Sequence, residues 1–380
     1  MWTEALSRIL ERVRHVSATV GPRFPLFVEP DGKWNTTTDG NWCAGYWIGL
    51  QFLAAARTDS DAERQRLTEL ARSGIERMES QTTQNIFAGV NHHVAGFWAY
   101  DVTGDPALQA LGLRGAQAMR ELYNPHIRQI PIGMVRLAPF DDANPEDAPL
   151  HNLMDTTAVD VIHTSLPVLW RAAAETGDRS FADIAMAHAL RHLELHCRPD
   201  GSTIQMTRVD DNGEPVERLN PLGDTLDSCW SRGLAWHIAG LADAYVATGL
   251  AAFLDPVERS VRYLRASCNG RIPAWDLTVP TGTRDSSAAA ITAYGLLRIA
   301  ARPDADGRVT ELEAEGRRLL HVLIQSCLDS EDAPTGLGGI AHGCYQYPQG
   351  VAVDTELIWG DFYTAAALDL VLSRCAEAGR

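Results

Sequence analysis

The stretch S-L-P-V-L-W-R-A-A-A-E-T-G-D, residues 165–178, shows the plan on which this chain is built. An apolar run with helical periodicity ends at Thr176, Gly177 and Asp178, and a second amphipathic run rich in Ala, Leu and Arg follows. Glycine readily takes the left-handed conformation that ends a helix, and an Asp directly after it can cap the next helix. The stretch therefore predicts two antiparallel helices joined by a tight turn.

The same plan recurs along the chain. Related turns fall at 58–60, 103–105 and 248–250, with a weaker one at 304–307. Six such hairpins, with few and short strand-like segments, predict an all-α fold, a closed (α/α)6 barrel formed by residues 1–380 as a single domain. The periodic runs that carry this prediction lie roughly at 3–17, 43–57, 61–80, 90–103, 106–123, 158–176, 180–197, 229–248, 252–267, 285–301, 308–328 and 355–376.

Longer loops precede every second helix, and in a barrel these loops would meet at one rim, which is a natural place for a pocket. One of them reads as a β-hairpin over 199–215 that turns at Asn212 and Gly213. Its cluster of acids at 210–214 lacks the distant Glu of a calcium loop, which favours a solvated turn. The loops are 29–42, 81–93, 125–160, 199–230, 271–285 and 336–354.

Composition restricts the function classes. The formal net charge of −16 argues against nucleic acid or an anionic membrane as a partner, and an acidic substrate would need a local basic clamp. Seven cysteines without a C-x-x-C pair indicate reduced thiols in a cytoplasmic protein. No segment has the length and apolarity of a membrane span, and the N-terminal run reads as an amphipathic helix, not a secretory signal. No metal or organic cofactor is indicated.

The stretch D-S-C-W-S-R-G-L-A-W, residues 227–236, combines Trp230, Arg232 and Trp236 at the start of an apolar helical run. A sugar stacks its C–H face on an indole, and the planar fork of Arg matches a carboxylate. The stretch therefore suits a sugar that carries a carboxylate. The alternative is that the indoles pack between helices and Arg232 is a capping or surface charge.

Several segments together resemble the unsaturated glucuronyl hydrolases, glycoside hydrolase family 88, and more distantly the unsaturated rhamnogalacturonyl hydrolases of family 105. The resemblance implies an enzyme for oligosaccharides with a 4,5-unsaturated uronic acid at the non-reducing end, in which an acid protonates C4, water adds at C5 and the resulting hemiketal collapses. The segments are W-C-A-G-Y-W-I-G at 42–49, 165–178, R-P-D-G-S-T at 198–203, 227–236, R-D-S-S-A-A-A-I at 284–291, H-G-C-Y at 342–345 and L-I-W-G-D-F-Y at 357–363.

The resemblance implies Asp160 as the general acid/base, with Asp155 as the fallback. An Asp at the start of a helix could equally be a cap. The family's second essential Asp follows a His in an H-D-x-G-F motif, which we match to H-V-A-G-F at 93–97, with Val94 in place of the acid. Either another acid serves, with Asp101 and Asp155 as candidates, or His93 handles the proton.

The resemblance also implies that Arg232 and Trp236 contact the substrate carboxylate and ring. The family's His after R-P-D-G-S falls at Gln205 and its Gln before the Trp-Ser-Arg stretch at Leu222. Where some members hold a sulfate with Ser and Lys, this chain has Gln346, Gln349 and Val351, which disfavours a sulfated substrate. Other substrate-binding candidates, some of which could instead be core residues, are Trp230, Trp42, Trp47, His92, His342 and Tyr345, whereas His163 and His237 are expected in the core.

Two other functions stay open from the sequence. One is a sugar lyase or epimerase on the same fold that uses His92 and His93 as bases. The other is a non-catalytic protein that binds acidic sugars, because function depends on the site and not on the fold. The sequence does not determine the linkage, the reducing-side sugar or the oligomeric state.

Overall fold

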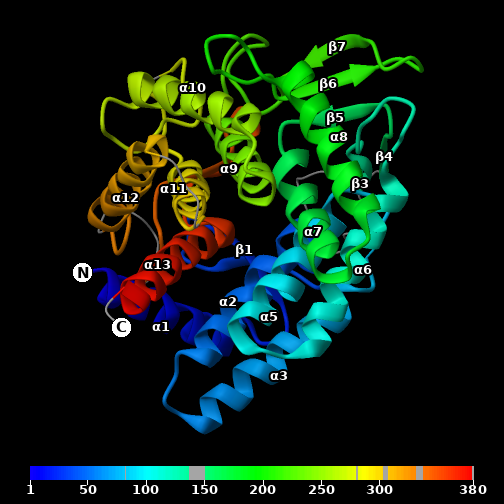
Figure 1. Ribbon diagram of the computed structural model, residues 1–380. Coiled ribbons are helices and arrows are strands. Elements are labelled where there is room, and N and C mark those ends of the chain that lie inside the picture. The colour runs from blue at the N-terminus through cyan, green and yellow to red at the C-terminus, as the bar shows by residue number, and fades with distance from the viewer. Residues whose placement is uncertain (82, 137–149, 280, 303–306, 331–336, 379–380) are drawn as a thin grey trace.

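The computed structural model describes residues 1–81, 83–136, 150–279, 281–302, 307–330 and 337–378 (Figure 1). With α4, η2 and α5 counted as one continuous helix, the described residues form twelve long helices. Their bounds are α1 Trp2–Val20, α2 Ala44–Ala56, α3 Asp61–Met78, α4 Phe87–His92, η2 His93–Trp98, α5 Ala99–Thr103, α6 Pro106–Leu122, α7 Val161–Thr176, α8 Arg179–His196, α9 Ser231–Thr248, α10 Ala251–Cys268, α11 Ser286–Ala300, α12 Arg308–Ser326 and α13 Ile358–Ala378.

Six of the helices form a closed inner ring. The helix α2 contacts α4 and η2, α4 contacts α7, and the ring continues through α9, α11 and α13 back to α2. The helices α1, α3, α6, α8, α10 and α12 pack outside this ring, each against its neighbours in sequence. The predicted (α/α)6 barrel is confirmed, and most helix ends lie within a few residues of their predicted positions.

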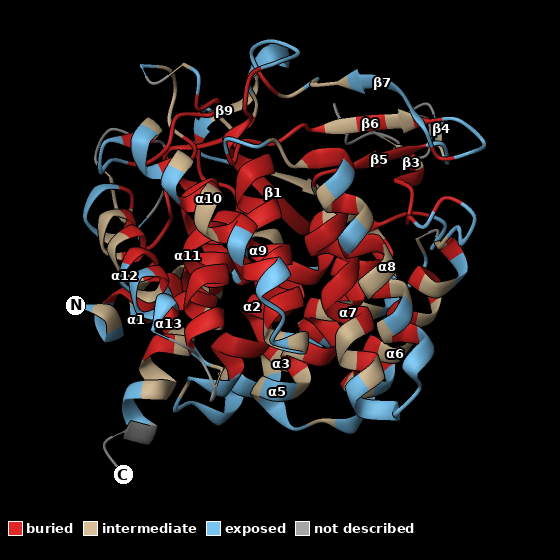
Figure 2. Cartoon of the chain, turned by 45° about the horizontal axis from the view of Figure 1, so that its top comes forward, coloured by how far each residue is buried: buried red, intermediate tan, exposed pale blue. Residues whose placement is uncertain are grey.

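The two rings differ in how apolar their helices are. Every residue of α2 except Ala56, and every residue of α11 except Arg298, is buried, as expected of helices that are apolar on all sides. The outer helix α3 instead buries one stripe, formed by Leu67, Ala71, Gly74 and Met78. Figure 2 shows this difference as a red interior surrounded by tan and blue helices. Among the described helices, none is long and apolar enough to cross a membrane.

The predicted turns have the expected conformations. Gly104, Gly177 and Gly249 end their helices with φ between 71° and 74°, where glycine carries no steric penalty. Asp178 caps the next helix by accepting a hydrogen bond from the Ser180 amide at 2.9 Å, and Asp105 does the same for the Ala107 amide at 3.0 Å. The predicted turn at 304–307 lies mostly outside the described residues.

Four small antiparallel sheets stand in the loops that precede inner helices. Most of their strands lie together at the top of the molecule in Figure 2, so the loops converge on one rim as predicted. The predicted hairpin is β6–β7, which begins later than expected, and Asp210 accepts hydrogen bonds from the Asn212 and Glu214 amides at its turn. The sheets are β1 Phe24–Val28 with β2 Trp34–Thr37, β3 Gly133–Arg136 with β4 Leu150–Leu153, β5 Thr156–Ala158 with β6 Met206–Val209 and β7 Pro215–Leu219, and β8 Gly343–Gln346 with β9 Val351–Thr355.

One helix start differs in a way that affects the site. The loop expected to run to His93 ends earlier, and α4 begins at Phe87, whose amide donates to the Asn85 side-chain oxygen at 3.0 Å. His93 therefore lies six residues inside an inner helix and not at the rim.

The close approach of α4 to α7 gives a test of the barrel packing. A Cβ at Gly89 would stand 2.3 Å from the Thr164 carbonyl oxygen and 3.1 Å from the Ser165 Cα, both backbone atoms of an inner helix. We expect Gly89→Ala to lower the free energy of unfolding by about 1–3 kcal/mol, measured by chemical denaturation. The control is Gly307→Ala, where nothing lies within 4 Å and φ is −61°, and which should be neutral or slightly stabilising. Equal stability of the two variants would contradict the packing.

Candidate active site

A cavity of about 240 Å³ lies at the end of the barrel that carries the strand pairs. It contains seven of the residues that the sequence singled out, and they come from loops and helix starts spread over the chain. These residues are Trp42, Asp160, Gln205, Trp230, Arg232, Trp236 and Tyr345.

Arg232, in the first turn of α9, is buried in an ion pair. Its Nη1 donates to Asp285 Oδ2 at 2.7 Å and to the Cys344 carbonyl, and its Nη2 donates to the Tyr345 carbonyl at 2.5 Å. Only 2% of Arg232 and none of Asp285 is exposed. The guanidinium carbon also lies 4.6 Å from the centre of the Trp230 ring. Arg232 is therefore structural as well as a candidate for binding substrate, because among the described residues its Nε–H and second Nη2–H make no hydrogen bond.

The indoles of the cavity are held by polar and aromatic contacts. Trp42 donates from Nε1 to the Tyr345 hydroxyl at 3.1 Å, and its ring centre lies 4.6 Å from that of Trp359. Trp236 stacks on His163 with ring centres 5.4 Å apart and 18° between planes. Trp47 is buried and does not line the cavity.

A hydrogen-bonded network stands behind Trp236, and the sequence did not reveal it. His163 Nδ1 lies 2.8 Å from Asp243 Oδ2, and its Nε2 lies 2.7 Å from the Tyr363 hydroxyl, which is 3.3 Å from the Tyr46 hydroxyl. His163 is buried, as expected, and His237 is also buried, with Nδ1 2.8 Å from His192 Nε2. The helical spacing of these residues offered no signal, because they come from separate inner helices.

Asp160 immediately precedes α7 and is half-buried at the cavity. Its side chain makes no capping hydrogen bond, which removes the main support for the purely structural alternative. Burial raises the pKa of Asp160 to about 6, and the positive charge of Arg232 opposes part of that rise. Relative to an ordinary Asp, the protonated form near neutral pH is enriched by about a hundredfold. Among the described residues that line this cavity, Asp160 is the sole carboxylate.

The other acid and histidine candidates lie elsewhere. Asp155 is exposed, accepts a hydrogen bond from the Thr156 hydroxyl at 2.8 Å and does not line the cavity. His92 is buried, with its Nδ1 2.8 Å from the Ala88 carbonyl oxygen. Val94 is buried inside η2. The expectation that His93 shares a cavity with Asp160 is wrong, because α4 begins six residues before His93 and presents Phe87 to that cavity instead.

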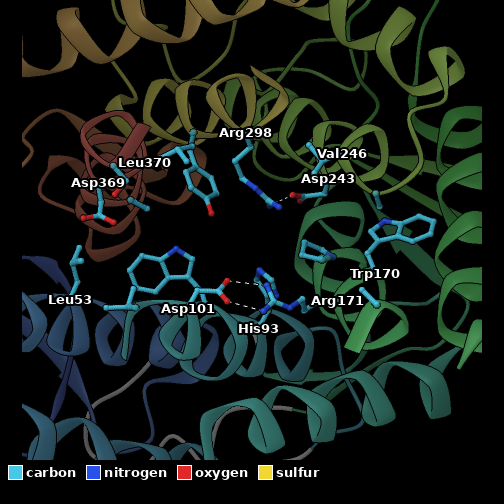
Figure 3. A pocket seen from close by; sticks show the side chains of 18 of the residues that line it. Leu53, His93, Asp101, Trp170, Arg171, Asp243, Val246, Arg298, Asp369 and Leu370 are labelled. Carbon is cyan, nitrogen blue, oxygen red and sulfur yellow. Dashed lines mark hydrogen bonds and ion pairs between the residues drawn. The ribbon is translucent and has the colours of Figure 1, made fainter. Parts of the chain in front are cut away.

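His93 lies at a second cavity, at the opposite end of the barrel. Figure 3 shows it between the C-terminal parts of inner helices, with Leu53, Trp170, Val246 and Leu370 around it. Burial, chiefly, lowers the pKa of His93 to about 3, so the imidazole is neutral.

This second cavity is larger, about 690 Å³, but its acids are occupied. Asp101 forms two hydrogen bonds with Arg171, at 2.7 and 3.0 Å, Asp243 pairs with Arg298, and Asp369 pairs with Arg57. Each of these carboxylates is thus engaged by an arginine. The smaller cavity with Asp160 is therefore the better candidate for acid catalysis.

The remaining candidate residues also divide into those that line the smaller cavity and those that do not. Gln205 is buried in the smaller cavity, where its Oε1 accepts a hydrogen bond from the Leu222 amide at 3.0 Å and holds that loop. Gln346 and Gln349 also line this cavity. His342 does not, because its ring nitrogens contact Asp354 at 2.7 Å and Ser330 at 3.0 Å.

No model of a protein family matches the chain. An unsaturated glucuronyl hydrolase of Bacillus sp. (strain GL1) is 27% identical over 384 residues, covering 97% of this chain and 96% of the relative. An unsaturated chondroitin disaccharide hydrolase of Streptococcus pyogenes serotype M1 is 26% identical over 379 residues, covering 96% and 90%.

Solved structures agree with these relatives. The crystal structure of the unsaturated glucuronyl hydrolase from Bacillus sp. GL1 matches with a TM-score of 0.85 at 27% identity, covering 99% of this chain and 97% of that one. The enzyme of the same name from Streptococcus agalactiae matches with a TM-score of 0.82 at 20% identity, covering 97% and 90%, which speaks to the fold alone. The resemblance to unsaturated glucuronyl hydrolases that the sequence motifs indicated is confirmed.

The buried ion pair predicts a large effect on stability. Arg232→Ala should lower the free energy of unfolding by about 3–5 kcal/mol, because it leaves the Asp285 carboxylate buried without its cation. Arg64, whose ion pair with Asp61 is exposed, provides the control, and Arg64→Ala should cost about 0–1 kcal/mol. Both are measured by urea unfolding. If both variants lowered the free energy of unfolding by similar amounts, the buried pair of Arg232 and Asp285 would contribute no more to stability than an exposed one.

Proposed function

We propose that this chain is a glycoside hydrolase that acts on oligosaccharides with an unsaturated uronic acid at the non-reducing end. The observation that carries the proposal is Asp160, a carboxyl that burial keeps partly protonated near neutral pH, inside a cavity with indoles and arginines. The relatives named as unsaturated glucuronyl and chondroitin disaccharide hydrolases, which match over nearly the whole chain, support the same reaction.

The reaction follows from the properties of the enol ether. The Asp160 carboxyl donates its proton to C4, and the positive charge that develops at C5 is shared with the ring oxygen. Water adds at C5 and gives a hemiketal. The ring then opens to a ketone at C5, and the hemiacetal left at C1 releases the neighbouring group. The product is an open-chain keto uronate, and no bond to the enzyme forms.

One carboxyl is sufficient for both proton transfers. After protonating C4, Asp160 is a carboxylate next to the attacking water and can accept the proton that the water loses. This cycle restores the acid. It explains how turnover proceeds with Phe87, and not an acid, at the start of α4, and with no other carboxylate from the described residues lining the cavity.

The substrate carboxylate is proposed to pair with the unused N–H groups of Arg232, while Trp236 supports the sugar ring. Gln346 and Gln349 line the cavity, and neutral amides at these positions hydrogen-bond hydroxyls without supplying the cation that a sulfate needs. An unsulfated substrate is therefore proposed.

The two alternatives receive less support. A lyase or epimerase built on His92 and His93 needs these bases at the substrate, and neither lines the cavity with Asp160. A protein that only binds sugars has no need for a carboxyl whose pKa burial raises to about 6. We further propose that residues 1–380 act as one catalytic domain in the cytoplasm, where the seven free cysteines would stay reduced.

Asp160→Asn tests the assignment of the acid. Turnover of an unsaturated uronyl disaccharide should fall by about 10²–10⁴-fold, because the amide cannot donate the proton, while binding is retained. Loss of the absorbance of the conjugated enol ether measures turnover, and quenching of Trp fluorescence measures binding.

Asp155→Asn and His93→Ala are the matched controls, since both residues lie outside the cavity, and both should keep turnover within a few-fold of the parent. If Asp160→Asn retained full turnover while Asp155→Asn lost it, the acid would be Asp155 and the proposed site would be wrong.

The raised pKa predicts the pH profile. The reactive form of Asp160 is protonated, so kcat/KM should be level below about pH 6 and fall about tenfold per pH unit above it. The measurement is initial rates at low substrate concentration from pH 5 to pH 9. A profile that stays level through pH 8 would exclude Asp160 as the general acid.

A further inference from the structure

The cavity at the end of the barrel opposite Asp160 is lined by all six inner helices. Each helix contributes residues from one of its faces, as α7 does with Pro167, Trp170 and Arg171, three and four residues apart. The volume of about 690 Å³ falls within the range of roughly 300–1,000 Å³ that is usual for small-molecule sites. The cavity is therefore large enough for a ligand of the size of one or two sugar rings.

The charged side chains that line this cavity balance one another. Three arginines and three aspartates form three ion pairs, which are Arg298 with Asp243, Arg171 with Asp101 and Arg57 with Asp369. His93 adds no charge, because burial, chiefly, lowers its pKa to about 3. The described lining therefore has no net charge. A charged ligand would lose water here without gaining an unpaired countercharge.

Aromatic rings form much of the remaining wall. Trp98, Trp170 and Tyr294 line the cavity, and Figure 3 shows Trp170 on the side opposite Asp369. Trp98 packs edge-on against Phe362, with ring centres 5.0 Å apart and 67° between planes. Both indoles are only partly buried, so part of each ring stays open to the cavity. Such rings accept the C–H face of a sugar.

Two polar groups of the wall have no hydrogen-bond partner among the described residues. These are His93 Nδ1 and Trp170 Nε1, and both atoms are buried. A neutral imidazole offers one donor and one acceptor nitrogen, and an indole only donates. A carboxylate only accepts hydrogen bonds and an ammonium only donates them, whereas a hydroxyl does both. Hydroxyl groups therefore suit this mixed wall better than either ion.

We propose that the cavity around His93, Trp170 and Arg298 is a second binding site, and that its ligand is a neutral sugar or a small neutral oligosaccharide. The sugar ring lies against the indoles, and its hydroxyls contact the imidazole and the ion pairs. The pairs extend from the floor to the mouth of the cavity, because the side chain of Asp243 is 3% exposed and that of Asp101 is 50% exposed. The proposed site is separate from the cavity with Asp160 and does not depend on the reaction proposed there.

Three monosaccharides that differ in charge test the class of ligand. They are methyl glucoside, which is neutral, methyl glucuronide, which is an anion, and the protonated methyl glycoside of glucosamine. Calorimetry on the parent chain and on Trp170→Ala measures, for each compound, the binding that depends on this cavity. We expect methyl glucoside to bind there about tenfold or more tighter than either ion. Tighter binding of an ion would overturn the proposal, and so would methyl glucoside binding that Trp170→Ala leaves unchanged.

Smaller changes locate the hydrogen bonds. His93→Ala and Trp170→Phe should each weaken methyl glucoside binding by several-fold, since each removes a polar group and leaves the ion pairs in place. Trp2→Phe is the matched control, because Trp2 Nε1 is also buried without a partner among the described residues but lies outside this cavity. Trp2→Phe should leave the affinity unchanged. Unchanged affinity in both cavity variants, or an equal loss in the control, would overturn the site.

Turnover of an unsaturated uronyl disaccharide separates this site from the proposed reaction. His93→Ala and Trp170→Phe should keep turnover within a few-fold of the parent, because neither residue lines the cavity with Asp160. A loss of turnover as large as the loss of methyl glucoside binding would show one shared site and overturn the proposal. If the parent chain itself shows no turnover, the proposed reaction is wrong, and the binding measurements still decide whether the second site exists.

Discussion

The buried ion pair between Arg232 and Asp285 is the interaction on which the end of the barrel around Asp160 depends. Arg232 belongs to α9, and Asp285 caps α11 through the Ser287 amide at 3.1 Å. The same guanidinium binds two carbonyls of β8. A buried charge that loses its partner costs several kcal/mol, so these three elements keep one arrangement. That arrangement places Trp230 and Tyr345 at the cavity and puts a positive charge near Asp160, which limits the rise in its pKa.

The two ends of the barrel differ in how their helices are connected and in how their carboxylates are paired. Short turns with left-handed glycines join the helices at one end, while long loops with paired strands precede the inner helices at the other. The end with short turns holds its carboxylates in ion pairs, whereas the end with long loops keeps Asp160 without a pairing partner among the described residues. Asp243 connects the two ends of the barrel. It pairs with Arg298 at the far cavity and contacts His163, on which Trp236 stacks. Asp243, at the far cavity, therefore supports Trp236 at the near one through His163.

Sequence periodicity located the helices well, and several candidate residues do line one cavity, but His92, His93 and His342 do not. Asp160 and Arg232 stand at the starts of two inner helices, and Trp236 follows Arg232 by one turn of α9, so the prediction that these helix starts converge was enough to bring the three together. His93 was assigned through a motif match, and the helix in fact begins at Phe87. Six residues of helix correspond to about 9 Å along the barrel axis, which moves His93 toward the opposite end. The network of His163, Asp243 and Tyr363 could not be predicted, because its members meet only when separate inner helices close the ring.

By itself the sequence determined the all-helical fold and the order of the hairpins, and it predicted the rim and the carboxyl that we propose for the chemistry. These properties depend on local periodicity, on turn residues such as Gly177 and Asp178, and on residue types at helix starts. The tertiary structure alone decided that Asp160 is shielded enough to raise its pKa, that Arg232 is already paired with Asp285, and that all six inner helices line a second cavity. Burial, pairing and the lining of a cavity arise from contacts between distant segments, and no local pattern encodes them.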